Sequence, residues 1–219
     1  MKKSIFVAIA VLMLCLPTRS FAIHVIGEEI KSKLSLKADI SNPENGESVI
    51  KQRISLHLQK GDLGTGGEVL LIPENDYLRF SPYVTLSVGL VTPVMGLSTD
   101  SSGKDHISAG IQYFGKLSEG IGLFVDLRNF WGLNSDSVDF IDNFAALLLA
   151  LDDKIFTGLD LIYDHYWESG DNWYLVGVPL GYKLTKSTTI FVRPSFDRYL
   201  SNDGHSDTYG FRVGANISF

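Results

Sequence analysis

The stretch FRVGANISF, residues 211–219, gives the clearest indication of the fold of this chain. Apolar side chains occupy alternate positions, with polar or small residues between them: Tyr209, Phe211, Val213, Ala215, Ile217 and Phe219. Successive side chains of a β-strand point to opposite faces, so this pattern predicts a strand with one apolar face. The other face carries Arg212, so the strand is not buried on both sides. Something apolar must therefore cover one face of it.

The beginning of the chain has the features of an export signal. Lys2 and Lys3 precede an uncharged, mostly apolar run over 5–16, and Ser20-Phe21-Ala22 has the spacing of a signal-peptidase site. That run is too short for a helix that crosses a bilayer, which needs about 20 apolar residues. We therefore expect a removed signal peptide at 1–22 and a single domain at 23–219.

Composition excludes several functional classes. The chain has 19 Lys and Arg against 25 Asp and Glu, a net charge of −6, and loss of the signal peptide makes it more acidic. An acidic chain without a basic patch has no electrostatic footprint for nucleic acid. Its one cysteine, Cys15, lies in the signal, so the mature chain has no disulfide and no thiolate ligand. We expect no cofactor and no bound metal.

The alternation seen at the C-terminus recurs along the chain. It predicts strands near 31–40, 49–59, 77–91, 105–115, 119–131, 143–151, 154–167, 172–184, 187–199 and 207–219. Most of them reach the 9–11 residues or so with which a tilted strand crosses hydrocarbon. Short connections such as TKST and LDDK alternate with longer ones at 92–104, 132–142, 168–171 and 200–206. This is the pattern of an outer-membrane barrel, with short turns on the periplasmic side.

A sheet in hydrocarbon must close on itself, because each unpaired backbone group there costs several kcal/mol. We therefore predict an antiparallel up-and-down β-barrel of about ten strands, with eight and twelve as the alternatives. Three features bear on that number. Segment 60–76 is long for a turn and could hide a strand, and FAALLLAL at 144–151 could form a small helix instead of a strand. Pro179 and Pro194 fall within predicted strands, where we expect a bulge or kink.

The last strand also carries a resemblance to a known family. Apolar residues at alternate positions, from Tyr209 to a final Phe219, resemble the assembly signal of Gram-negative outer-membrane β-barrels. The resemblance covers the signal peptide, the last strand and the general pattern, without indicating one subfamily. It implies the cell outer membrane as the location. It also implies the barrel-assembly machinery, outer-membrane lipids and lipopolysaccharide as partners.

If the apolar faces meet lipid, the opposite faces line the interior. The predicted lining combines cations, anions and one histidine: Lys33, Lys37, Asp39, Arg53, His57, Asp126, Arg128, Asp160, Asp164, Lys183, Arg193, Asp197 and Arg212. Such a set can form a closed network of ion pairs that fills the barrel, or it can line a narrow pore that selects small polar or anionic solutes. The sequence does not separate these two interpretations.

A catalytic interpretation can also be tested on the sequence. His106, Ser108 and Glu119 resemble the His/Ser/Glu set of the outer-membrane lipid A deacylase family, in which a histidine activates a serine. Ile107 and Ala109 are the lipid-facing neighbours here, which turns His106 and Ser108 inward, and Glu119 falls in a turn at the opposite strand end. We therefore expect no enzyme. The function predicted is a narrow porin-like channel for small polar solutes. The main alternative is a filled barrel with a structural or adhesive role that acts through its extracellular loops, and a lipid A deacylase-like hydrolase is the third.

Overall fold

The computed structural model describes residues 31–43 and 47–219, so the predicted signal peptide lies outside the described residues. Within these ranges, thirteen strands form a single antiparallel sheet. A 3₁₀ turn, η1 (Pro73–Asn75), joins the third and fourth strands. The strands are β1 (Lys31–Pro43), β2 (Val49–Lys60), β3 (Leu63–Ile72), β4 (Tyr77–Leu86), β5 (Val91–Asp100), β6 (Asp105–Ser118), β7 (Ile121–Gly132), β8 (Phe140–Ala150), β9 (Ile155–Tyr166), β10 (Asn172–Gly177), β11 (Leu180–Lys183), β12 (Thr188–Ser201) and β13 (Gly204–Ser218).

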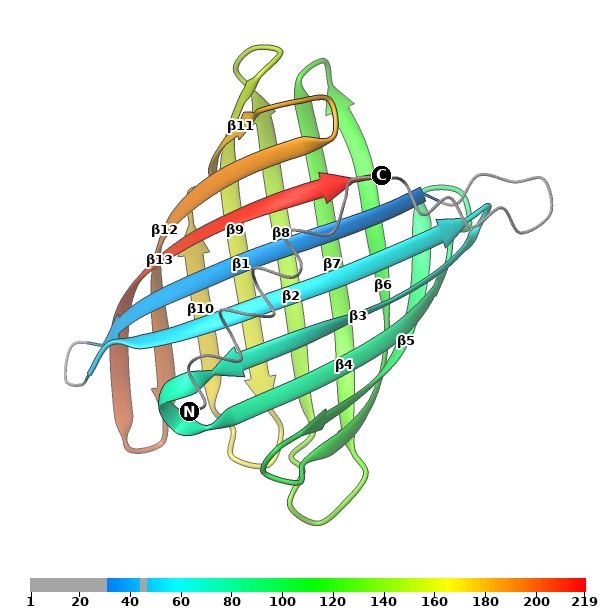
Figure 1. Cartoon of the computed structure of the whole chain (residues 1–219). Coiled ribbons are helices and arrows are strands. Elements are labelled where there is room, and N and C mark those ends of the chain that lie inside the picture. The colour runs from blue at the N-terminus through cyan, green and yellow to red at the C-terminus, as the bar shows by residue number, and fades with distance from the viewer. Residues whose placement is uncertain (1–30, 44–46) are drawn as a thin grey trace, which may run out of the picture.

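The sheet closes into a barrel through its first and last strands (Figure 1). β1 and β13 pair from Lys33 opposite Ser218 to Pro43 opposite Thr208. The seam continues beyond the strand ends, where the Phe219 N–H donates to the Ser32 carbonyl at 2.9 Å. Closure pairs the first and last strands of the described sheet with each other, as a bilayer requires.

β10 and β11 occupy one position in the barrel, because both pair with β9 on one side and β12 on the other. The barrel therefore has 12 strand positions. The break falls at Val178 and Pro179, which confirms the expected irregularity at Pro179, since proline has no N–H to donate to the ladder. β12 keeps its register with β13 through Pro194, but on its other side the pairing stops at Ser195 and resumes at Val192, so the irregularity expected in this hairpin lies opposite Pro194.

Two strands account for the difference between the ten predicted and the twelve observed. Segment 60–76 holds all of β3, whose glycines weaken its alternation. They are needed for packing: a Cβ on Gly66 would lie 2.6 Å from the Tyr83 ring on β4. The predicted loop 92–104 holds most of β5, where Pro93 and the inward Val94 obscure the pattern. The predicted loop 200–206 likewise shortens to 202–203.

β8 confirms the strand interpretation of FAALLLAL, since it pairs with β7 and β9 along its length. Its two neighbours supply the backbone partners that override the helix preference of Ala and Leu. No helix among residues 31–43 and 47–219 is long and apolar enough to cross a bilayer.

The two faces of the barrel wall differ as the alternation predicts. Large apolar side chains are exposed on the outside, for example Val84, Met95 and Leu97, each more than half exposed. The polar faces meet inside. We call the end where β1 begins and β13 finishes the terminal end, at the upper right of Figure 1, and the opposite end, which carries the connection 133–139, the loop end.

Candidate functional site

The lumen contains two cavities in series along the barrel axis. The cavity at the terminal end has a volume of about 620 Å³, and the cavity at the loop end has a volume of about 820 Å³. Lys37, Phe144 and Arg212 line both of them. These three side chains therefore stand where the two cavities meet, and a solute passing along the axis would have to pass them.

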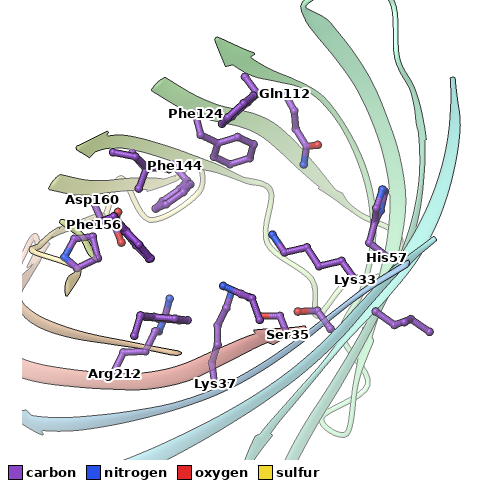
Figure 2. Close-up of a pocket in the computed structure, with 18 of the residues that line it drawn as sticks. Lys33, Ser35, Lys37, His57, Gln112, Phe124, Phe144, Phe156, Asp160 and Arg212 are labelled. Atoms are coloured by element: carbon purple, nitrogen blue, oxygen red, sulfur yellow. The ribbon is translucent and has the colours of Figure 1, made fainter. Parts of the chain in front are cut away.

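The cavity at the terminal end has two chemically different walls. Lys33 and Lys37 of β1 and Arg212 of β13 project into it from one side, and Figure 2 shows phenylalanine rings opposite them. Among the described residues, neither lysine ammonium has a hydrogen-bond or ion-pair partner. The aromatic wall comes from five strands: Phe114, Phe124, Phe144, Phe156 and Phe191.

A continuous series of ion pairs, the ion-pair belt, crosses the inner wall from β9 to β4. Asp39 is its centre: it accepts hydrogen bonds from Arg212, one of them at 3.0 Å, and lies 3.4 Å from Arg53 and 4.0 Å from Arg193. The belt continues at one end to Asp160 and at the other to Glu68 and Arg79. It spans the β1–β13 seam, so it stabilises the closed barrel as well as charging its wall.

Glycine makes one link of the belt possible. Arg193 on β12 reaches Asp160 on β9 at 3.1 Å, although β10 lies between those strands. A Cβ on Gly177 of β10 would lie 2.8 Å from the Arg193 Cδ atom, so the guanidinium crosses β10 where there is no side chain. Arg193 is only 2% exposed in consequence.

A second group of polar side chains lies on β4, β6 and β7. The Arg128 guanidinium donates two hydrogen bonds to Asp126, at 2.8 and 2.6 Å, and Gln112 donates to the same carboxylate at 2.8 Å. The Arg128 guanidinium also stacks over the Tyr83 ring, 5.7 Å from its centroid. This bidentate, stacked geometry holds the arginine against the wall.

The cavity at the loop end is richer in acid. Asp142 and Asp164 lie directly opposite each other on β8 and β9, and the buried Asp164 has an oxygen without a hydrogen-bond partner among the described residues. Tyr77 donates to Asp100 at 3.1 Å at the same end. The two cavities therefore differ in charge, with Lys33 and Lys37 toward the terminal end and carboxylates concentrated toward the loop end.

The predicted lining residues lie on inner faces, although their role in conduction stays a prediction. Lys33, Lys37, His57, Asp160 and Arg212 line the terminal-end cavity, and Arg53 and Asp164 line the loop-end cavity. Asp39, Arg193 and Asp197 line a small void of about 30 Å³ beside the ion-pair belt. Asp126 and Arg128 form an ion pair with each other. Lys183 lies at the terminal rim on β11 and lines neither of the two cavities.

Sequence reasoning missed several important lumen residues. Glu68 and Asp142 were assigned to connections, and they lie on β3 and β8. The lumen-facing rings were also missed, although a signal for them exists: Phe124 alternates in step with Asp126 and Arg128. Three aromatic side chains, Tyr166, Trp173 and Tyr199, also line the loop-end cavity.

The residues of the catalytic interpretation do not form a triad. The His106 Nε2 atom lies 3.2 Å from the Val138 carbonyl, and its ring packs against Phe140, while Ser108 is buried. Glu119 lies in the β6–β7 connection at the terminal end, whereas His106 is near the loop end. Histidine and acid thus lie at opposite ends of the barrel.

The residues of the proposed assembly signal point outward from the barrel. Tyr209, Phe211, Val213 and Phe219 are 40–65% exposed. Their apolar face is thus available to lipid or to a partner in the membrane, and their role as a signal stays a prediction.

A closed antiparallel barrel with an apolar outside and a charged lumen is the architecture of an outer-membrane β-barrel. No protein-family model and no curated protein matches the sequence. Among solved structures, the chain is similar to a KdgM porin in complex with disordered oligogalacturonate, with a TM-score of 0.65 and 14% identity over 85% of this chain and 99% of that one. It is also similar to the NanC porin, with a TM-score of 0.59 and 8% identity over 84% of this chain and 98% of that one. At these identities the likeness concerns the fold.

Proposed function

We propose that this barrel is a narrow channel through which small polar solutes cross the outer membrane, with a preference for anions. The observation that carries the proposal is the junction of the two cavities, where Lys37 stands without an ion-pair partner among the described residues. Arg212 beside it pairs with Asp39, so Lys37 is the junction cation that no carboxylate among the described residues engages.

The strand number supports an open lumen. Eight-stranded barrels are just wide enough for side chains to fill, while 16–18 strands leave an aqueous channel. Twelve strands lie between these limits, and cavities of about 620 and 820 Å³ remain beside the side chains. The ion-pair belt supports the same conclusion, because carboxylates engage its guanidiniums and hold them near the inner wall.

The likeness to the KdgM porin supports anions as solutes. That porin is in complex with oligogalacturonate, a chain of sugar acids. A free lysine at a constriction suits such a charge, because at 4 Å two unit charges attract by about 1 kcal/mol in bulk water and about 4 kcal/mol near a protein surface. Either figure is enough to change the ratio of anion to cation permeability severalfold.

Single-channel recording in planar bilayers tests the proposal. The refolded protein should give discrete conductance steps, and its reversal potential in a KCl gradient should indicate preference for chloride. Lys37→Glu should move that potential toward cation preference, because it changes the charge at the junction by two units. Lys154→Glu makes the same change in the terminal-end turn 151–154, outside both cavities, and should leave the potential nearly unchanged.

Two results would contradict the proposal. A correctly folded barrel that shows no steps above the bilayer background would indicate a closed lumen. Equal shifts from Lys37→Glu and Lys154→Glu would show that the junction does not set selectivity.

A further inference from the structure

The terminal-end cavity has an apolar wall that ion conduction does not require. The lumen of an outer-membrane barrel is generally polar, because water fills it. Here half-buried phenylalanine rings from β7, β8, β9 and β12 face that lumen: Phe124, Phe144, Phe156 and Phe191. Leaving four such rings in contact with lumen water is unfavourable, and an apolar ligand that covers them would recover free energy.

Glycines on neighbouring strands fix the orientation of two of these rings. A Cβ on Gly181 would lie 2.0 Å from the Phe156 ring, and a Cβ on Gly214 would lie 2.5 Å from the Phe191 ring. Each ring therefore lies across a glycine, flat against the barrel wall, and does not fill the lumen. The Phe124 and Phe144 rings are 5.8 Å apart at their centroids and form the adjoining part of the wall. Together they form a preformed apolar surface.

The wall opposite supplies unpaired positive charge. Lys33 and Lys37 are four residues apart on β1, so they lie on the same face of the strand. Their ammonium groups project toward the phenylalanine wall (Figure 2). Neither has an ion-pair partner among the described residues, whereas the arginines nearby are held by carboxylates of the ion-pair belt. The lysines are therefore available to a ligand.

We propose that the terminal-end cavity is a binding site for aromatic monocarboxylates, with the carboxylate on Lys33 and Lys37 and the ring against Phe124, Phe144, Phe156 and Phe191. The two walls require an anionic head and a flat apolar body in one molecule. The cavity volume of about 620 Å³ is within the range of about 300–1,000 Å³ typical of small-molecule sites. This inference deepens the proposed function and rests on a lumen that solutes can enter.

Binding is measured on the refolded barrel in detergent micelles by isothermal titration calorimetry with four probes. Benzoate has both required features, benzamide lacks the charge, acetate lacks the ring, and galacturonate carries its charge on a polar ring. We expect benzoate to bind at least about tenfold more tightly than each of the others, because each of them lacks either the charge or the apolar ring.

Variants assign the two walls separately. Lys37→Met keeps an unbranched side chain and should weaken benzoate binding about tenfold. Phe144→Leu keeps an apolar residue and should weaken benzoate while leaving acetate unchanged. Lys154→Met, outside the cavity, is the matched control, and heat-modifiable gel migration shows that each variant is folded.

The outcomes separate this site from the channel proposal. Equal affinities for benzoate and galacturonate, or benzoate binding unaffected by both Lys37→Met and Phe144→Leu, would overturn the site even if the protein conducts anions. Benzoate binding with the expected variant effects in a barrel that gives no conductance steps would keep the site and overturn the channel.

Discussion

Replacing Asp39 by asparagine removes the central charge of the ion-pair belt. Asp39 contacts three guanidiniums, those of Arg53, Arg193 and Arg212, and its side chain is 12% exposed. The asparagine would leave three mutually repelling cations around a neutral amide. Removing one partner of a buried ion pair costs about 3–5 kcal/mol, because the remaining charge stays desolvated. We expect Asp39→Asn to lower the free energy of unfolding by about that amount.

Urea unfolding of the refolded barrel, followed by tryptophan fluorescence and by gel migration without boiling, measures this loss. Asp207→Asn is the matched control, because Asp207 also pairs bidentately with an arginine on the neighbouring strand, with both distances at 2.7 Å. The partner there, Arg198, has a side chain that is 45% exposed, so water replaces the lost interaction. The control should unfold at nearly the wild-type urea concentration. Similar midpoints for the two variants would refute a stabilising role of the belt.

Two further variants test the geometry of the wall and the closing strand. Gly177→Ala should lower the urea midpoint and displace Arg193, because the new Cβ would lie 2.8 Å from the Arg193 Cδ atom. A high-resolution structure of the variant with the Arg193–Asp160 pair intact would contradict this. Deletion of Phe219 should slow assembly into membranes, since it removes the outward ring and the backbone hydrogen bonds to Ser32 at the seam. Assembly is measured as the fraction of heat-modifiable protein over time. An unchanged rate would contradict the predicted signal.

The alternation of side chains was sufficient to predict the class of fold. Strand β13 illustrates why: one of its faces meets lipid and the other meets the lumen, so apolar and polar side chains alternate along its length. The pattern fails where packing inside the barrel requires a different residue. Gly66 on β3 makes room for the Tyr83 ring, and Val94 on β5 is an apolar residue on an inner face. Both strands were therefore assigned to connections.

The site could be predicted only as a set of inward-facing charges. Which charges pair depends on register across several strands, and a missing strand changes every pairing beyond it. Arg193 and Asp160 are 33 residues apart in sequence and meet only because β10 between them carries Gly177. No local pattern contains that information. The phenylalanine wall was accessible in principle, since Phe124 shares the parity of Asp126, but an apolar residue on a polar face is easily read as an irregularity.

A charged barrel interior can be a filled network or a pore lining, and in this lumen the two roles fall to different side chains. Arg53, Arg193 and Arg212 are engaged by carboxylates, so they brace the wall and the β1–β13 seam. Lys33 and Lys37 extend from the same region of wall without such partners among the described residues. A flexible ammonium beside a fixed guanidinium belt can reach a passing anion without loosening the barrel. Lys37 variants should therefore change selectivity with little effect on stability, whereas Asp39 variants should lower stability.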